Sequence, residues 1–167
     1  MKVYTNDCHL GQMPKAKIFA NVWTKVLDEY MREFNYMANC ANLSLSVAPL
    51  DDNVNFQWSG FNDTMSTYVL DSISQLVQMR QVNLEEIFDQ VKEKLLKDWA
   101  NFYLGQSYQQ AFTFFDNNTL NTSVEMKVLS QLLESYTFSE FEAQHKDWLA
   151  NGRQTWLVSG NLMPEEA

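Results

Sequence analysis

The hydrophobic period of this sequence changes within its first sixty residues, and this change limits the folds open to the chain more than any other feature. Over residues 24–42 apolar side chains recur every three or four positions and charged ones take the opposite face, as in an amphipathic helix. Over residues 43–47 and 54–59 the period is two, and the turn-forming residues 48–53 lie between them. The pattern predicts a helix followed by an antiparallel hairpin with one buried face.

The helical period returns after Gly60 and persists to about Asn151. Asp63 is expected to cap the first of these helices, because its carboxylate can accept a hydrogen bond from an unpaired backbone N–H. Three later starts have a polar residue three positions before a glutamate, the spacing of a capping box. The three pairs are Asn83 with Glu86, Thr122 with Glu125, and Thr137 with Glu140.

The spacing also predicts which side chains these helices bury. The expected apolar stripes are Leu27, Tyr30, Phe34, Met37, Ala38 and Ala41; Met65, Tyr68, Val69, Ile73, Leu76 and Val77; Leu84, Ile87, Phe88, Val91, Leu95, Trp99 and Phe102; Met126, Leu129, Leu132 and Leu133; and Phe138, Phe141, Trp148 and Leu149. A shorter helix is marked by Tyr108, Ala111, Phe112 and Phe115, and is expected to stop in the polar residues 116–118.

Further strands are expected near both ends of the chain. Residues 2–6 and 15–20 each read as a short strand, and residues 155–159 read as a buried strand that joins the hairpin sheet. Residues 164–166 resemble the first turn of a helix. The predicted fold class is therefore α+β, with helices packed on one face of a mainly antiparallel sheet.

Composition narrows the classes of function. A chain of 167 residues with 46% hydrophobic content fits one domain, and it can bury a core without a disulfide or metal. Cys8 and Cys40 are expected to be free thiols. The net charge of −9 argues against binding to nucleic acid or an anionic membrane, because such binding needs clustered lysine and arginine. Without a signal-like or membrane-spanning apolar run, the expected location is cytoplasmic.

No residue pattern for catalysis is formed. Zinc hydrolases place two histidines on one helical face, as in HExxH or HxxEH, whereas His9 and His145 are far apart in sequence. Glu142 and His145 have the spacing of half a di-iron site, but no second Glu-x-x-His exists, so we interpret them as a solvent-facing pair. Cys8 and His9 are neighbours in sequence, and such neighbours rarely place a thiol and an imidazole in catalytic geometry.

Nucleophile and phosphate motifs are also missing. Ser159-Gly160 lacks the rest of a GxSxG elbow, and the five glycines form no phosphate-binding loop. The tryptophans fall mostly on apolar faces and are interpreted as core. We therefore predict no catalytic, cofactor-binding or metal-binding residue in this chain.

Four local motifs, taken in order, carry a family resemblance. They are Met13-Pro14-Lys15-Ala16; the helix end Phe34-Asn35-Tyr36-Met37-Ala38-Asn39-Cys40-Ala41-Asn42-Leu43-Ser44; the strand end Ser59-Gly60-Phe61-Asn62-Asp63; and Leu157-Val158-Ser159-Gly160-Asn161. The set resembles the middle, or third, domain of insulinase-type (pitrilysin-type) zinc metallopeptidases, a family that includes insulin-degrading enzyme and nardilysin. The similarity spans nearly the whole chain.

The resemblance implies a non-catalytic role. In that family the first domain carries HxxEH and the zinc, while the third and fourth domains form half of a clamshell chamber around peptide substrates. It implies that residues 1–167 form a single middle domain, shortened near residues 20–23 and lacking the final helix. The expected function is that of a substrate-chamber or scaffold domain, with peptides and the remaining metallopeptidase domains as partners and with no cofactor of its own.

Two other hypotheses remain open. One is a free-standing module that binds peptides or proteins through an exposed sheet edge, without an enzymatic role. The other is an unrelated hydrolase whose site is assembled from residues distant in sequence. Apolar faces that normally meet neighbouring domains would lie open in a separate domain, so self-association is also expected.

Overall fold

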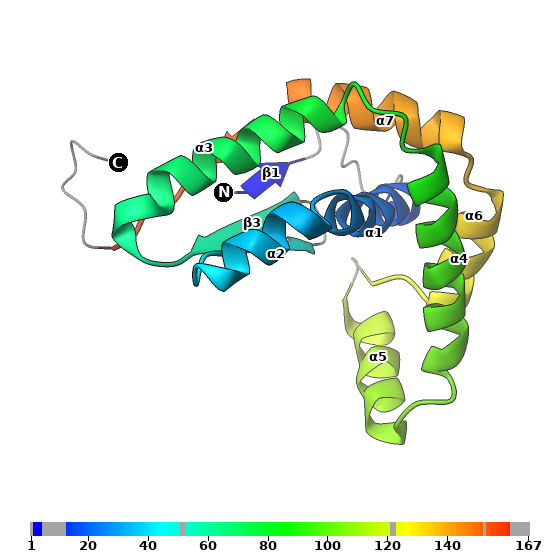
Figure 1. The fold of residues 1–167 in the computed structure, drawn as a ribbon. Helices are drawn as coiled ribbons and strands as arrows, with labels where there is room; N and C mark the ends of the chain where they lie inside the picture. The colour runs from blue at the N-terminus through cyan, green and yellow to red at the C-terminus, as the bar shows by residue number, and fades with distance from the viewer. Residues whose placement is uncertain (1, 5–12, 51–52, 121–122, 152, 161–167) are drawn as a thin grey trace.

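The computed structural model describes residues 2–4, 13–50, 53–120, 123–151 and 153–160. Within these ranges the chain is mainly helical and carries a small antiparallel sheet, so the α+β class holds in its broad form (Figure 1). In chain order the elements are β1 Lys2–Tyr4, α1 Met13–Tyr30, α2 Arg32–Cys40, β2 Ser44–Pro49, β3 Asn53–Ser59, α3 Asn62–Met79, α4 Glu85–Phe102, α5 Ser107–Thr119, α6 Met126–Ser135, α7 Phe138–Asn151 and β4 Arg153–Thr155.

The sheet has the strand order β2-β3-β1-β4, with every neighbouring pair antiparallel. The predicted hairpin is confirmed, because β2 and β3 pair in register from Ser44 opposite Ser59 to Pro49 opposite Val54. The predicted strand at residues 2–6 is confirmed over Lys2–Tyr4, and its last two residues lie outside the described ranges. The first strand therefore enters the sheet between the hairpin and the last strand.

The two faces of the hairpin differ as the period of two requires. Val54 and Phe56 of β3 are buried, and Leu45 and Val47 of β2 pack with Trp58 against the same core. The intervening Ser46 of β2 and the Gln57 and Ser59 of β3 are exposed on the other face, where Asn55 is half-buried. One face of the hairpin is thus covered and the other is polar.

The prediction of a strand at residues 15–20 is wrong, since α1 occupies this segment. Ile18, Val22 and Val26 are four residues apart, and Phe19, Trp23 and Leu27 are placed beside them, so a helix turns all six inward. Pro14 is the second residue of α1, where its missing N–H breaks no hydrogen bond. Burying each large apolar side chain contributes roughly 1.5–3 kcal/mol, which favours the helix over an exposed strand.

The single helix predicted over residues 24–42 is two helices. The chain turns at Met31, between α1 and α2, and the Met31 side chain is buried in the core. Backbone hydrogen bonds bridge the turn, from Met31 N to Leu27 O at 2.9 Å and from Asn35 N to Met31 O at 2.8 Å. Met37 was expected on the buried stripe, but it is exposed because α2 packs only one narrow side, through Phe34 against Tyr68.

The core is centred on α1. The Trp23 ring lies edge-on to Trp148 of α7, with ring centroids 4.5 Å apart, and edge-on to Phe56 of β3 at 5.9 Å. Phe88 of α4 meets Phe141 of α7 at 5.2 Å. These contacts join the sheet to the helices on either side of α1.

The helix starts bear out some of the capping predictions. Thr137 and Glu140 form the predicted capping box: Thr137 N donates to Glu140 Oε2 at 3.0 Å, and Glu140 N donates to Thr137 Oγ1 at 3.4 Å. Asn83 Oδ1 accepts from Glu85 N at 3.1 Å, although the cap position is Leu84.

Other starts differ from the predictions. Asp63 is not a cap, because α3 begins one residue earlier and Phe61 holds the cap position without a side-chain bond. Glu125 itself holds the cap position of α6, and Thr122 lies outside the described ranges. Val77 of α3 was expected to be buried but is exposed, whereas Met79, two residues further on, is buried. The polar residues 116–118, expected as a loop, are helical in α5.

The last strand is displaced from its predicted position. It spans Arg153–Thr155, is exposed throughout, and is followed by residues without regular structure, so a buried strand at 155–159 is wrong. It nevertheless enters the predicted sheet, by pairing with β1 from Lys2 opposite Thr155 to Tyr4 opposite Arg153. The helix turn expected at residues 164–166 lies outside the described ranges.

The elements form two limbs at an angle (Figure 1). One contains the sheet with α2 and α3, and the other contains α4 with α6 beside it and α5 at its far end. Helices α1 and α7 lie where the limbs meet. The predicted shortening near residues 20–23 falls inside α1, which runs through this segment without a break.

Candidate functional site

The polar face of the sheet is the candidate site. The strand period and the register place Ser44 and Ser46 of β2 on the same face as Asn55, Gln57 and Ser59 of β3. Ser44 Oγ and Ser59 Oγ lie 2.7 Å apart in a hydrogen bond across the two strands. Ser46 and Gln57 are directly opposite each other and both are exposed. The face therefore offers neutral hydrogen-bond donors and acceptors to solvent.

Two strands form the edges of this sheet within the described residues. β2 pairs only with β3, and β4 pairs only with β1. An edge strand has backbone N–H and C=O groups that an extended peptide can use to add as a further strand. Such an arrangement can bind a peptide backbone of varied sequence.

His145 is not the solvent-facing residue that the sequence predicted. Its imidazole is only 2% exposed, stacks on Phe141 at 5.8 Å, and accepts a hydrogen bond at Nδ1 from Trp23 Nε1 at 2.9 Å. Glu142 instead pairs with Lys146 in solvent, at 2.7 Å. One turn of helix separates Glu142 from His145, but α7 lies against α1 at this point, so its inward side is covered.

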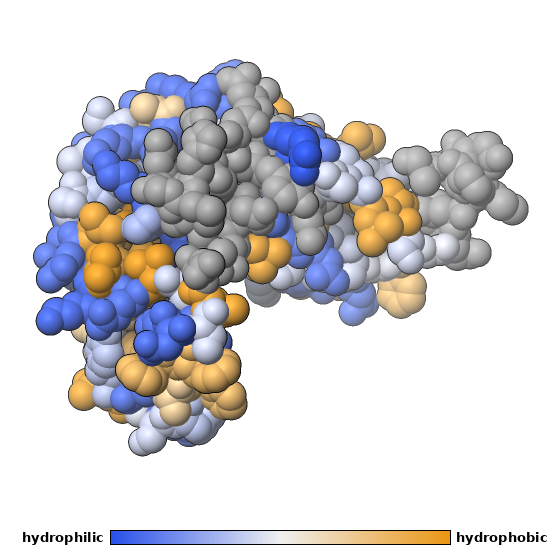
Figure 2. Space-filling model, turned by 180° about the vertical axis from the view of Figure 1, so that it is seen from behind, coloured by the Kyte–Doolittle hydropathy of each residue, from blue (hydrophilic) through white to orange (hydrophobic). Residues whose placement is uncertain are grey.

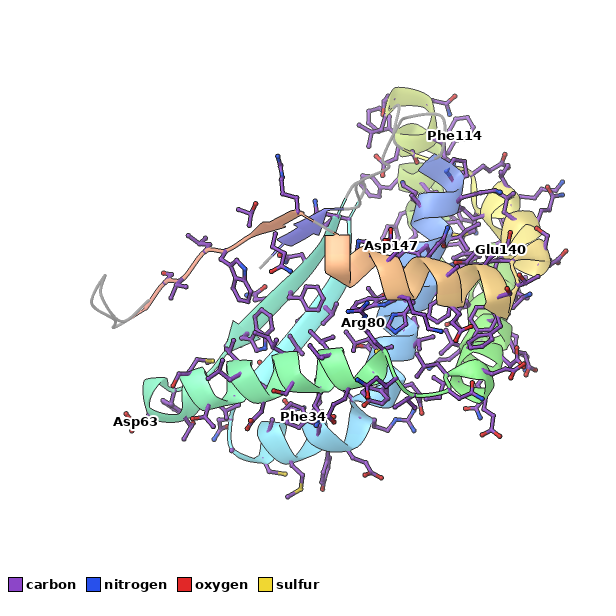
Figure 3. The ribbon with its side chains drawn as sticks, turned by 90° about the horizontal axis from the view of Figure 1, so that it is seen from above. Phe34, Asp63, Arg80, Phe114, Glu140 and Asp147 are labelled. Carbon is purple, nitrogen blue, oxygen red and sulfur yellow. The ribbon has the colours of Figure 1, made fainter. Side chains whose placement is uncertain are left out.

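Burial holds the pKa of His145 below its usual value of 6.5. The backbone of Met79 opposes this shift, while the charges of Arg80 and Lys146 reinforce it and the charge of Glu142 opposes it. Arg80 lies at the end of α3 beside α7, where its Nη2 donates to the Lys146 carbonyl at 2.7 Å (Figure 3). Nε2 of His145 meets no acceptor with good hydrogen-bond geometry among the described residues. The imidazole is therefore a neutral packing group.

The remaining candidates from the sequence are not brought together. Within the described ranges no three side chains of His, Cys, Asp or Glu lie close enough to hold a metal ion. Cys40 is exposed and is a free thiol, as predicted. Cys8 and His9 lie outside the described ranges. Ser159 lies in an exposed segment without regular structure.

A groove lies between the end of α4, α5 and the start of α6. Its volume is about 680 Å³, and its lining mixes the rings of Phe102, Tyr103 and Phe114 with the amides of Gln110 and Asn117. Gln110 Nε2 bonds the carbonyls of Tyr103 and Gly105, and so ties α5 to the turn before it. The sequence marked α5 as a helix, but no signal in the sequence indicated that it would lack a partner.

Alternation along β2 and β3 could have identified the polar face, because the residues between the apolar ones must point the other way. The burial of His145 had a weaker signal in the sequence. His145 follows Phe141 by four residues, so the two side chains share one face of the helix. No helix in the described parts of the chain is both long enough and apolar enough to cross a membrane.

Comparison with known proteins gives two matches. A family model described as the middle or third domain of peptidase_M16 matches residues 1–135. A protein of Arabidopsis thaliana named "Insulin-degrading enzyme-like 1, peroxisomal" is 25% identical over 131 residues, which cover 75% of this chain and 13% of that protein. The family match ends with α6, whereas α7 beyond it supplies Phe141 and Trp148 to the same core.

Proposed function

Because the chain belongs to the family of middle, or third, domains of M16 peptidases, we propose that it forms a non-catalytic wall of a chamber that encloses peptides in an insulinase-like zinc metalloendopeptidase. The family assignment confirms the resemblance found in the sequence. The chain spans 13% of the relative, so the zinc and the peptide-cleaving residues of the proposed enzyme would be supplied by other domains. In this proposal the chain itself binds no cofactor.

The observation that carries the proposal is the polar face of the sheet, on which Ser46 and Gln57 are exposed among the described residues. Helix α1 packs on the opposite face, so peptide is expected to approach from the side of Ser46 and Gln57. Hydroxyl and amide groups pair with a peptide backbone whatever its sequence, which suits a wall that meets many substrates. The net charge of −9 favours neutral or basic peptides over acidic ones.

A chimaeric enzyme tests the proposal. This chain replaces the matching segment of the Arabidopsis relative, and hydrolysis of one basic and one acidic fluorogenic peptide is followed. Hydrolysis by the chimaera is expected. Ser46→Glu combined with Gln57→Glu should raise KM for the acidic peptide and lower it for the basic one, by about twofold to thirtyfold each, because each of the two added charges is worth roughly 0.2–1 kcal/mol in an exposed pair.

The matched control is Ser74→Glu with Gln78→Glu, which adds the same charges to exposed positions on α3. If the control shifts KM as much as the sheet variant, or if neither does, the sheet is not the peptide wall. Fluorescence anisotropy of the same labelled peptides with the isolated chain measures peptide binding directly. This second readout does not depend on correct folding of the chimaera.

The free-standing module remains a second candidate, and the exposed edge strand β4 favours it. That module would bind peptide in isolation and would not support hydrolysis in the chimaera. The two functions therefore predict opposite results for hydrolysis by the chimaera. Cytoplasmic location stays a prediction, and the name of the Arabidopsis relative places that protein in the peroxisome.

A further inference from the structure

We propose that the groove between the end of α4, α5 and the start of α6 binds a small protonated amine with an apolar body. The groove lies in the limb away from the sheet (Figure 1), and Figure 3 labels Phe114 of its lining on α5. This inference does not depend on the proposed chamber role, which concerns the polar face of the sheet.

The size of the groove and its rings suit a small organic molecule. Its volume of about 680 Å³ falls within the range of roughly 300–1,000 Å³ that is typical of sites for such ligands. The lining includes the rings of Phe102, Tyr103 and Phe114, and the first two pack edge to face with centroids 5.5 Å apart. Figure 2 shows hydrophobic side chains interleaved with hydrophilic ones on this limb, seen from behind. Aromatic rings bind an apolar group, and their faces also attract a cation.

Two amide side chains in the lining are arranged as hydrogen-bond acceptors. Gln110 Nε2 donates to the carbonyls of Tyr103 and Gly105, at 3.0 and 3.2 Å. Asn118 Nδ2 donates to the Phe114 carbonyl at 2.7 Å. No group in the described part of the chain donates to the side-chain oxygens of these two amides. Each oxygen can therefore accept a hydrogen bond from a ligand.

The charges near the groove are acidic. Glu125 is exposed in the lining, and residues 98–126 contain three acidic residues but no lysine, arginine or histidine. Asn117 differs from the other two amides of the described lining, because its Oδ1 accepts from Ser123 Oγ at 2.5 Å and its N–H groups remain as donors. The balance of charge and of hydrogen-bonding groups thus favours a ligand that is positive and donates.

Other classes of ligand fit the groove less well. An anion would find no positive side chain in residues 98–126, and the net charge of −9 would repel it. A neutral aromatic compound could pack on the rings but would bring no charged donor to the oxygens of Gln110 and Asn118. A protonated amine directs its N–H groups to these oxygens and lays its apolar body on the rings, and hydrogen bonds from a charged donor are stronger than neutral ones.

An NMR titration of the full ¹⁵N-labelled chain with 2-phenylethylammonium tests the proposal. At about pH 7, where the amine is protonated, we expect saturable shifts in the backbone amides of residues 102–120. The matched ligands 2-phenylethanol and 3-phenylpropionate are neutral and negative, and each should bind at least about tenfold more weakly. An increase in salt from about 50 to about 300 mM should weaken binding of the amine but not of the alcohol.

Phe114→Leu combined with Glu125→Gln removes one ring and the charge of the lining. The double variant should bind the amine about tenfold more weakly. It should fold, because Phe114 is 71% exposed and Glu125 makes no side-chain hydrogen bond at the start of α6. The matched control is Phe112→Leu with Glu134→Gln, which changes an exposed ring and an exposed acid of α5 and α6 outside the described lining. The control should bind the amine as the unchanged protein does.

Four results would overturn the inference: no saturable shift, equal affinity for the three ligands, an unchanged affinity in the double variant, or an equal loss in the control. A capped tetrapeptide with one lysine and one phenylalanine presents the same ammonium group from a peptide. Tighter binding of this peptide than of the amine would contradict a small-molecule site. Failure of the chimaera to hydrolyse peptides would leave this inference standing, so the two proposals fail separately.

Discussion

Acidification should destabilise this protein through His145 in a way that a single substitution can isolate. Trp23 Nε1 can only donate, so the Nδ1 that it contacts at 2.9 Å must keep its lone pair. Protonation would place an N–H against an N–H in a core where the ring also stacks on Phe141. The folded state therefore resists the proton that the unfolded chain accepts.

The sign of the effect follows from the lowered pKa of His145. Because the folded pKa lies below the unfolded value of 6.5, the unfolded state binds more protons, and stability rises with pH. Stability from this group is fully present above pH 6.5 and is lost as the pH falls below it. From pH 7.5 to 5.5 the loss is at most about 1.4 kcal/mol, reached if folded His145 takes up no proton in this window.

Urea unfolding followed by circular dichroism at pH 7.5, 6.5 and 5.5 measures this loss. A change of about 1.4 kcal/mol corresponds to a fall in Tm of roughly 3–6 °C for a domain of this size. The control is His145→Gln, whose side-chain carbonyl can still accept from Trp23 Nε1 but takes up no proton in this range. That variant should be less stable at every pH, because the ring stacking is lost, yet nearly insensitive to pH.

Every other titrating group, including the carboxylate of Asp28, whose pKa is raised by burial, is common to both proteins. The difference between their pH profiles therefore reports His145. Parallel profiles for the two proteins would refute the reasoning, because they would show that the imidazole titrates alike in the folded and unfolded states.

Two smaller perturbations test the helix starts and the hairpin end. Thr137→Ala removes the hydroxyl half of the capping box of α7 and should lower the free energy of unfolding in urea by about 1 kcal/mol. An unchanged urea midpoint would show that the bond from Thr137 N to Glu140 is enough to cap the helix. Gly60→Ala places a Cβ 2.5 Å from Leu43 Cδ2 and 3.0 Å from the Asn42 carbonyl oxygen. This crowding should lower the free energy of unfolding by roughly 1–3 kcal/mol. An unchanged Tm in thermal unfolding would mean that the Leu43 side chain moves aside without cost.

The sequence by itself determined the elements whose signal is local. In the hairpin the apolar residues of β2 and β3 alternate with polar ones, and a slip of one residue would turn the apolar side chains away from the core, so the pattern set the register. The Thr137–Glu140 capping box is equally local, since both partners lie within one turn. The polar face that forms the candidate site followed from the same alternation.

Tertiary structure decided what the local signal left ambiguous. Residues 15–20 are a short mixed stretch that was interpreted as a strand, but the structure includes them in α1, the helix that buries Trp23 against Trp148 and Phe56. The turn at Met31 follows from the same burial. The last strand lies at Arg153–Thr155, where it pairs residue for residue with β1, a segment about 150 residues away in sequence.

Tertiary contacts also decided the role of His145 and the exposure of α5. Glu142 and His145 are one turn apart in any helix, and only the position of α7 against α1 turned the imidazole inward to Trp23. The rings of Tyr108, Phe112 and Phe115 have the spacing of a buried stripe, yet no described element reaches them. Periodicity fixes which side chains share a face, and the contacts between distant segments decide whether that face is covered.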